Sequence, residues 1–271
     1  MPQYRIVRTL WVFVFTALAV CAQPDARGLV RESIRNGEEA WKKSFSYYCI
    51  KDDVNRQFDS SGQVKEVDND VYDIIPLGDH TSYQVHVEHN GEPVTGSEKV
   101  KSQQELREWR SASPALKHRR FEKQLTDRSY MKEVADAFNF RIRGEEHLPT
   151  GPAWVVEATP RPGYEAKSRY AHMFPKMRGT LWIDQKDIQW VRADAVATDT
   201  VAFGFFIARL AKGSHIILEQ MKLPDGTWVP KRIEAKASAR TFIFFTHNFE
   251  EDITYSRYRK ETALTASSGS R

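Results

Sequence analysis

The stretch SEKVKSQQELREWRSASPALKHRRFEKQLTDRSYMKEVADAF, from Ser97 to Phe138, decides the fold that the sequence predicts. It is rich in charge, and its apolar residues recur at helical spacing, with Leu106 and Trp109 on one face of a first helix. The same residues would not alternate as a half-buried strand requires. This stretch therefore predicts helices in the middle of the chain.

A second helix is expected to start inside this stretch. Ser113-Pro114 is typical of such a start, because serine caps a helix and proline fits its first position. Residues 115–125 continue as a helix, and we expect Asp127 to cap a third one. The sequence thus predicts one helical insert at about 97–138.

Strand patterns flank this insert on both sides. Before it, residues 45–58, 63–77 and 80–89 are rich in Val, Tyr and Phe, and Asn90-Gly91 is a strong hairpin signal. After it, strand patterns recur as far as Tyr258.

About ten long strands around one helical block predict a mainly β (α+β) fold. We expect a strongly curved antiparallel sheet or unclosed β-barrel, with the helices as a lid on its concave side. A division into two domains near residue 95 is the alternative, but three strands alone would make a poor core.

The N-terminus is typical of an export signal. Arg5 and Arg8 precede an apolar run from Thr9 to Val20, and small residues then predict cleavage after Ala22. Residues 1–22 are expected to be a signal peptide, which predicts a periplasmic or secreted bacterial protein. A short membrane anchor or a buried helix is the alternative.

Cys21 allows a second kind of processing, lipidation. Leu18-Ala19-Val20-Cys21 resembles a bacterial lipobox, in which the cysteine becomes the lipidated first residue, although Val20 is larger than usual there. In that case acyl chains would make the protein a membrane-anchored lipoprotein. At the other end, residues 263–271 are rich in serine and are expected to be a disordered tail.

Charge gives no reason to expect a nucleic-acid partner. The chain has 40 Lys and Arg against 36 Asp and Glu, so loss of Arg5 and Arg8 leaves 38 against 36, a net charge of +2. Cys49 would then have no partner for a disulfide, and its aromatic, strand-like surroundings predict an inert core thiol.

The sequence carries no familiar enzyme signature. It lacks G-x-S-x-G, H-E-x-x-H, P-loop and G-x-G-x-x-G motifs, so we expect no enzyme and no cofactor. The nearest metal-like group is His80, His86 and His89 with Glu88, but on a regular strand His86 and His89 would face opposite sides. We therefore expect no metal site.

An apolar run offers a candidate ligand site. Val201 to Leu210 (VAFGFFIARL) is the most apolar stretch after the signal, and it can be a buried strand or the lining of a hydrophobic cavity. Ordinary core is the alternative to a cavity. The candidate ligand-binding residues are Trp182, Trp190, Phe203, Phe205, Phe206, Trp228, Phe242 and Phe244.

The helical insert offers a candidate partner site. Between Ser97 and Lys123 it has eight Lys or Arg against four Glu, and Lys117, Arg119 and Arg120 lie in its densest basic part. A solvated helix face is the ordinary explanation. The functional alternative is docking of an acidic partner or of anionic lipid head groups.

Two stretches of the C-terminal half carry a resemblance to a known family. RGTLWIDQKDIQWVRADA at 178–195 and LPDGTWVPKRIE at 223–234 resemble the bacterial outer-membrane lipoprotein-sorting superfamily, which includes the periplasmic lipoprotein carriers. The resemblance covers residues 140–260. The whole chain after the signal is also similar to secreted proteins of soil bacteria, through Phe45-Ser46-Tyr47-Tyr48, the helical insert, and Gly204 with Gly213.

The resemblance implies a fold and a function. The family fold is an unclosed antiparallel barrel whose helices cover a hydrophobic cavity for acyl chains. It implies that residues 23–262 form a single half-barrel domain. It also implies an exported, non-enzymatic protein that binds a lipid, an acylated protein or another hydrophobic ligand. This chain is longer than the carriers and its helices are more charged, so no functional residue is carried over. The alternative is a cell-envelope protein–protein interaction or sensor module without a ligand.

Overall fold

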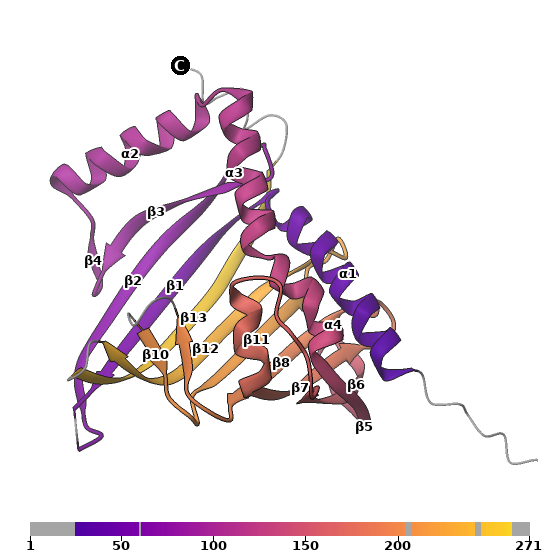
Figure 1. Ribbon diagram of the computed structural model, residues 1–271. Coiled ribbons are helices and arrows are strands. Elements are labelled where there is room, and N and C mark those ends of the chain that lie inside the picture. Colours follow the sequence, from indigo (N-terminus) through magenta and orange to yellow (C-terminus); the bar gives the residue numbers. More distant parts are fainter. Residues whose placement is uncertain (1–24, 60, 204–207, 242–244, 262–271) are drawn as a thin grey trace, which may run out of the picture.

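The computed structural model describes residues 25–59, 61–203, 208–241 and 245–261. Thirteen strands in these residues belong to one sheet (Figure 1). The strands are β1 Tyr47–Phe58, β2 Val64–Pro76, β3 Ser82–His89, β4 Glu92–Pro93, β5 Phe138–Leu148, β6 Gly151–Pro160, β7 Met177–Asp184, β8 Trp190–Ala197, β9 Val201–Phe203, β10 Ala208–Leu210, β11 His215–Lys222, β12 Trp228–Thr241 and β13 Phe245–Lys260.

The sheet follows one antiparallel path, in the order β4-β3-β2-β1-β13-β12-β11-β8-β7-β6-β5. The short strands β9 and β10 pair with each other off this path, and β10 also pairs with β12. Because β4 and β5 end the path and do not pair within the described residues, the barrel is unclosed. The predicted fold class is therefore confirmed. Strands from before and after the helical insert share this sheet, since β1 and β13 pair at its centre.

The helices are α1 Ala26–Ser44, α2 Gly96–Arg110, α3 Pro114–Asp127 and α4 Val134–Ala137, with 3₁₀ turns η1 Ser129–Glu133 and η2 Tyr170–Lys176. α1 begins after Asp25, whose carboxylate accepts hydrogen bonds from the backbone N–H groups of Arg27 and Gly28. Lys42 and Lys43 lie in its last turn, where their positive charges interact favourably with the negative end of the helix dipole. Within the described residues, none of these helices has the length and apolar composition needed to cross a membrane.

The helical insert follows the predicted order, with one correction. α3 begins as expected, with Pro114 in its first turn and the Ser113 hydroxyl accepting from the Leu116 N–H at 3.3 Å. Asp127 was expected to cap a third helix, but it is the last residue of α3 and pairs with Lys123 one turn earlier, at 2.6 Å. The chain then continues as a 3₁₀ turn before α4.

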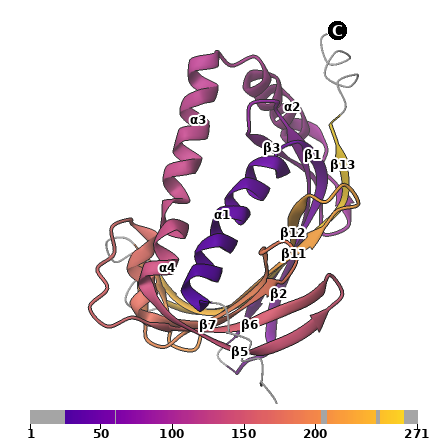
Figure 2. The same ribbon diagram turned by 90° about the vertical axis from the view of Figure 1, so that its right-hand side faces the viewer.

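α1 lies in the concave side of the sheet and fills the half formed by β5 to β8, here called the filled half (Figure 2). Its buried stripe includes Val30 and Ile34, which pack with Val156 of β6 and Ile183 of β7. Val30, Val156 and Ile183 are each 0% exposed. A fully buried side chain of this size contributes about 1.5–3 kcal/mol, so this contact anchors α1.

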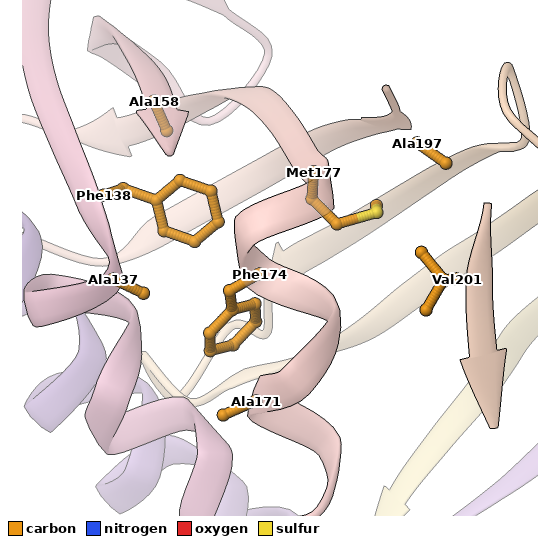
Figure 3. Close-up of a cluster of buried hydrophobic side chains, with 8 residues drawn as sticks. All are labelled: Ala137, Phe138, Ala158, Ala171, Phe174, Met177, Ala197 and Val201. Carbon is orange, nitrogen blue, oxygen red and sulfur yellow. The ribbon is translucent and has the colours of Figure 1, made fainter. Parts of the chain in front are cut away.

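A second apolar cluster extends the core below α4. Phe138 at the start of β5 contacts Phe174 of η2, with ring centroids 5.4 Å apart (Figure 3). Met177, Ala197 and Val201 complete the cluster from β7, β8 and β9. The apolar run that begins at Val201 is thus anchored in the core at its first residue, which is 3% exposed.

The half formed by β1, β2 and β3, here called the open half, has few buried side chains. Only Tyr47, Cys49 and Pro76 are buried in these three strands, and neither α2 nor α3 has a buried residue. Figure 2 shows α3 running beside α1 on the concave side. The helices therefore cover the open half without filling it.

A β-bulge between β2 and β3 corrects the placement of the histidines. Tyr72 pairs with His86, whereas Val71 pairs with Glu88, so Val87 is the extra residue. This extra residue brings His86 and His89 to the same face of the sheet, opposite to what a regular strand predicts. The reason given for expecting no metal site is thus wrong.

Candidate binding site on the concave side

Ring side chains gather where α1, α2, α3 and the turn between β2 and β3 meet. None of them is fully buried, and His80 is exposed. This aromatic cluster consists of Trp41 of α1, Phe45 directly after α1, His80 of the turn, Tyr83 of β3, Trp109 of α2 and Phe121 of α3.

Phe121 is the contact between α3 and the rest of the cluster. Its ring stacks on Trp41 with centroids 6.2 Å apart and planes 12° apart, and it lies 5.4 Å from His80. Trp41 in turn meets Phe45 edge-on at 4.9 Å. Such pairs each stabilise by about 0.5–1.5 kcal/mol beyond their buried area, so they hold α3 without a core.

α2 is held through β3 in the same way. The Tyr83 hydroxyl donates to Glu105 Oε2 at 2.6 Å, and its ring lies 5.6 Å from Trp109. Burial first, and then the hydrogen bond to Glu105, raises the pKa of Tyr83 to about 12. Arg120 of α3 stacks on Trp109 at 3.7 Å, which joins α3 to α2.

α3 presents an apolar face that no core receives. Leu116, Phe121 and Leu125 are half-buried, and the helix carries no buried residue. At its C-terminal end Arg128 lies over the Trp41 ring at 4.4 Å and pairs with Glu38 at 3.3 Å. The helix is therefore tethered at this end while its apolar face stays incompletely packed.

The concave face of the sheet changes from apolar to charged across its width. Residues that are directly opposite in neighbouring strands face the same side, so one row can be followed from β6 to β3. This row runs Val156, Leu181, Ala193, Leu218, Ile233, Ile253, Asp53, Asp70 and His89. Because Val156 packs on α1, the whole row faces the concave side, and the change falls between β13 and β1.

Charges on this part of the concave face are held close together. Lys51 Nζ lies 2.7 Å from Asp53 Oδ2, and the two side chains are only 14% and 17% exposed. Lys51 also lies over the Tyr72 ring at 5.0 Å. On the neighbouring strand, burial first, and then the charge of Asp53, raises the pKa of Glu251. The open half thus offers polar groups beside an apolar surface.

A cleft of about 370 Å³ lies between the second half of α1 and the turns that precede β8 and β12. Its floor includes Trp228, which is 6% exposed and donates its indole N–H to Asp187 Oδ2 at 2.7 Å. Lys222 Nζ reaches the same oxygen at 2.6 Å. The lining residues are Asn36, Glu39, Ala40, Lys43, Asp187, Gln189, Lys222, Gly226, Thr227 and Trp228.

The structure brings two of the three predicted tryptophans to α1 and separates the third. Trp190 lies against Gly37 of α1, and Trp228 lines the cleft. Trp182 alternates with Leu181 and Ile183, which face the concave side, so it lies on the convex face. There it donates to Glu146 at 2.6 Å. The three tryptophans therefore do not line one cavity.

The predicted phenylalanines fall mostly outside the described residues. Phe203 is the last residue of β9, whereas Phe205, Phe206, Phe242 and Phe244 lie outside. The predicted signal with Cys21 and the predicted tail also lie outside them. Their roles stay predictions.

The predicted basic residues do not form one exposed surface. Arg119 is exposed and Lys117 half-buried, while Arg120 lies on the Trp109 ring. The aromatic cluster was not predicted from the sequence. The spacing places Trp109 on a helix face, but it could not show that Trp41, His80 and Phe121 gather near it.

Comparison with known proteins gives structural matches only. No protein-family model and no curated protein matches the chain. A DUF1329 family protein from Desulfovibrio piger is 14% identical, with a TM-score of 0.33 over 88% of this chain and 94% of that chain. A LolA superfamily protein from Nitrosomonas europaea is 13% identical, with a TM-score of 0.36 over 85% and 94%.

A putative outer membrane lipoprotein-sorting protein domain from Vibrio parahaemolyticus is 9% identical, with a TM-score of 0.29 over 87% of this chain and 94% of that chain. The structural matches thus include the lipoprotein-sorting superfamily that the sequence resembles. Identities and TM-scores this low say nothing about the ligand of this chain.

Proposed function

We propose that the chain is an exported, non-enzymatic protein that binds a lipid, an acylated protein or another hydrophobic ligand on the concave side of the half-barrel. The observation that carries this proposal is the half-buried apolar face of α3, which runs beside α1 on the concave side and contributes no buried residue. The apolar face of an amphipathic helix is stabilised when another apolar surface covers it.

The size of the driving force suits reversible binding. An acyl chain of about 16 carbons gains about 0.8 kcal/mol for each CH₂ that leaves water, or roughly 13 kcal/mol if fully covered. Immobilising the ligand and moving the helices offset much of this gain. A lid held by ring contacts such as Phe121 on Trp41 can open, whereas a helix with a packed core would not.

The mixed character of the concave face indicates an amphipathic ligand. Its apolar part would lie along Ile233, beside the buried Ile253, and its polar end would reach Lys51 and Asp53 on the strand after Ile253. Trp190 and Trp228, at the other side of α1, are proposed to contact the ligand where it passes the helix. Phe203, Phe205, Phe206, Phe242 and Phe244 remain candidates that rest on the sequence alone. Trp182 lies on the convex face and is not part of the proposed site.

Export is part of the proposal. It is supported by the charged and apolar pattern of residues 1–22, and lipidation of Cys21 would place the protein at a membrane surface.

The test begins with the protein as it is purified. An organic extract of the mature chain is examined by mass spectrometry, and the stripped protein is titrated with a fluorescent palmitate analogue. We expect a co-purified lipid and saturable binding. Phe121→Ala and Leu125→Ala should each weaken binding several-fold, whereas Val100→Ala, at a residue of α2 that is 61% exposed, should not. A clean extract together with no saturable binding would overturn the proposal.

The alternative is a partner-binding module that uses a sheet edge or the basic helix. Two observations weigh against it. The edge strand β5 carries a bulge near Gly144 and exposed charges such as Arg141 and Glu145, which hinder addition of another strand. Arg120 is turned onto Trp109 and away from a partner. A salt-sensitive partner lost in the Lys117→Ala, Arg119→Ala double variant, with lipid uptake unchanged, would favour this alternative.

A further inference from the structure

Three ligand-type side chains converge on the concave face of the open half. Asp70 lies on β2, and the bulge at Val87 brings His86 and His89 to the same face of β3. Each offers one nitrogen or oxygen atom, and these atoms lie within 4.8 Å of one another. Asp70 Oδ1 is 2.9 Å from His86 Nε2 and 2.7 Å from His89 Nδ1.

We propose that Asp70, His86 and His89 form a binding site for a divalent transition-metal ion of the Zn²⁺ type. Two imidazoles and one carboxylate suit such an ion, whereas Mg²⁺ and Ca²⁺ prefer oxygen ligands alone. Binding of this ion does not require the hydrophobic ligand proposed above.

The orientation of His86 supports this assignment. Its Nδ1 lies 2.7 Å from Glu98 Oε1, in the first turn of α2, so Nδ1 carries the proton and donates to that carboxylate. Nε2 is buried and makes no hydrogen bond among the described residues, although Asp70 Oδ1 is close. A lone pair that faces a carboxylate needs a proton or a cation between them.

Glu98 holds His86 as outer carboxylates hold histidine ligands in metal proteins. Such a partner fixes the tautomer and the ring orientation, and its loss typically weakens metal binding by about 10–100-fold. The Tyr72 ring stacks on His86 at 4.9 Å and limits its rotation further. The side chain of His86 is only 20% exposed.

In the metal-free form, the third ligand, His89, is held to Asp70 by a shared proton. His89 Nε2 lies 3.1 Å from Asn90 Nδ2, and Asn90 Oδ1 accepts from the Asn69 N–H at 2.7 Å. His89 therefore donates Nδ1–H to Asp70. An ion would bind Nδ1 of the other tautomer, in which the proton has moved to Nε2, and the Asn90 Nδ2 group would have to move away from Nε2.

Little movement is needed for the ion to enter. Zn²⁺ bonds of about 2.0–2.2 Å in tetrahedral geometry place neighbouring ligand atoms roughly 3.3 Å apart. The observed separations of 2.7 and 2.9 Å to Asp70 need to open by about half an ångström. His89, which is 53% exposed, leaves the remaining position open to water.

The test uses the mature chain without a histidine tag, titrated with zinc chloride by calorimetry and with Co²⁺ by visible absorption. We expect one ion per chain and the absorption of a Co²⁺ site with imidazole ligands. His86→Ala, His89→Ala and Asp70→Asn should each weaken binding at least tenfold, and Glu98→Gln should weaken it by about 10–100-fold. The control is His147→Ala, an exposed histidine of β5 that should bind as the wild type does.

Folding of each variant is checked by circular dichroism, and Asp70→Asn keeps the shape of its side chain if the alanine variants unfold. Zinc should also raise the Tm of the wild type and not that of Asp70→Asn. Absence of binding to the wild type, or equal affinity in His86→Ala and His147→Ala, would overturn the proposal.

Discussion

Phe121 of α3 stacks on Trp41 of α1 with ring planes 12° apart, although the two residues are separated by 80 positions in the sequence. This pair and the Arg128–Glu38 ion pair join α3 to α1, which is anchored in the core through Val30 and Ile34. The contact therefore decides how firmly the helices cover the open half.

Phe121→Ala is expected to loosen α3 more than it destabilises the whole protein. Loss of the ring pair should lower the free energy of unfolding by about 1 kcal/mol, because Phe121 is half-buried and belongs to no core cluster. Amide exchange should become faster in α2 and α3 and stay unchanged in α1. Equal acceleration in α1 would show that the helices open as one unit, contrary to this prediction.

Gly37→Ala is expected to destabilise the protein, although alanine is the better helix former. A Cβ at this position would lie 2.7 Å from Trp190 Nε1 and 3.1 Å from its Cδ1, so the indole or α1 has to shift. Overpacking of this kind costs about 1–3 kcal/mol, more than the roughly 1 kcal/mol that helix propensity contributes. Urea unfolding measures the difference. Trp190→Phe should restore part of the loss in the double variant, and a Gly37→Ala protein more stable than the wild type would contradict the packing of α1.

Asp187→Asn is expected to lower stability at neutral pH and to matter less in acid. Burial alone would raise the pKa of Asp187, but hydrogen bonds from Lys222 and Trp228 hold it below its ordinary value of 3.8. The ionised form therefore stabilises the fold above about pH 4, and this contribution is lost as the pH falls through the lowered pKa. We expect the substitution to lower the free energy of unfolding by about 1–3 kcal/mol at pH 7.

Unfolding of the wild type and of Asp187→Asn at pH 7, 5 and 3 checks the sign of this effect. The two curves should approach each other as the pH falls below about 4 and Asp187 takes up its proton. A difference that grows in acid would mean that the carboxylate is not stabilised by Lys222 and Trp228.

Cys49 is expected to resist alkylation in the folded protein. Its side chain is 8% exposed, and burial raises the pKa of the thiol from 9.0 to about 11 despite a hydrogen bond with Tyr258. At pH 8 this lowers the thiolate fraction by about 100-fold. Iodoacetamide should therefore modify Cys49 at least that much more slowly in buffer than in urea, as followed by mass spectrometry. Rapid labelling without urea would place Cys49 outside the core.

The sequence by itself determined the class of fold and the order of its elements. Strand alternation before Asn90 and after Phe138, with helical spacing between them, is local information that a regular backbone converts directly into structure. The Ser113-Pro114 start of α3 was predictable for the same reason.

Only the tertiary structure decided which side chains meet. The aromatic cluster unites segments from α1, the β2–β3 turn, β3, α2 and α3, whose positions depend on the curvature of the sheet. The Val87 bulge moves His89 to the face of His86. Trp182 and Trp228 are separated in the same way, because strand pairing assigns them to opposite faces. Contacts between distant segments arise from packing and register, and no local pattern in the chain records them.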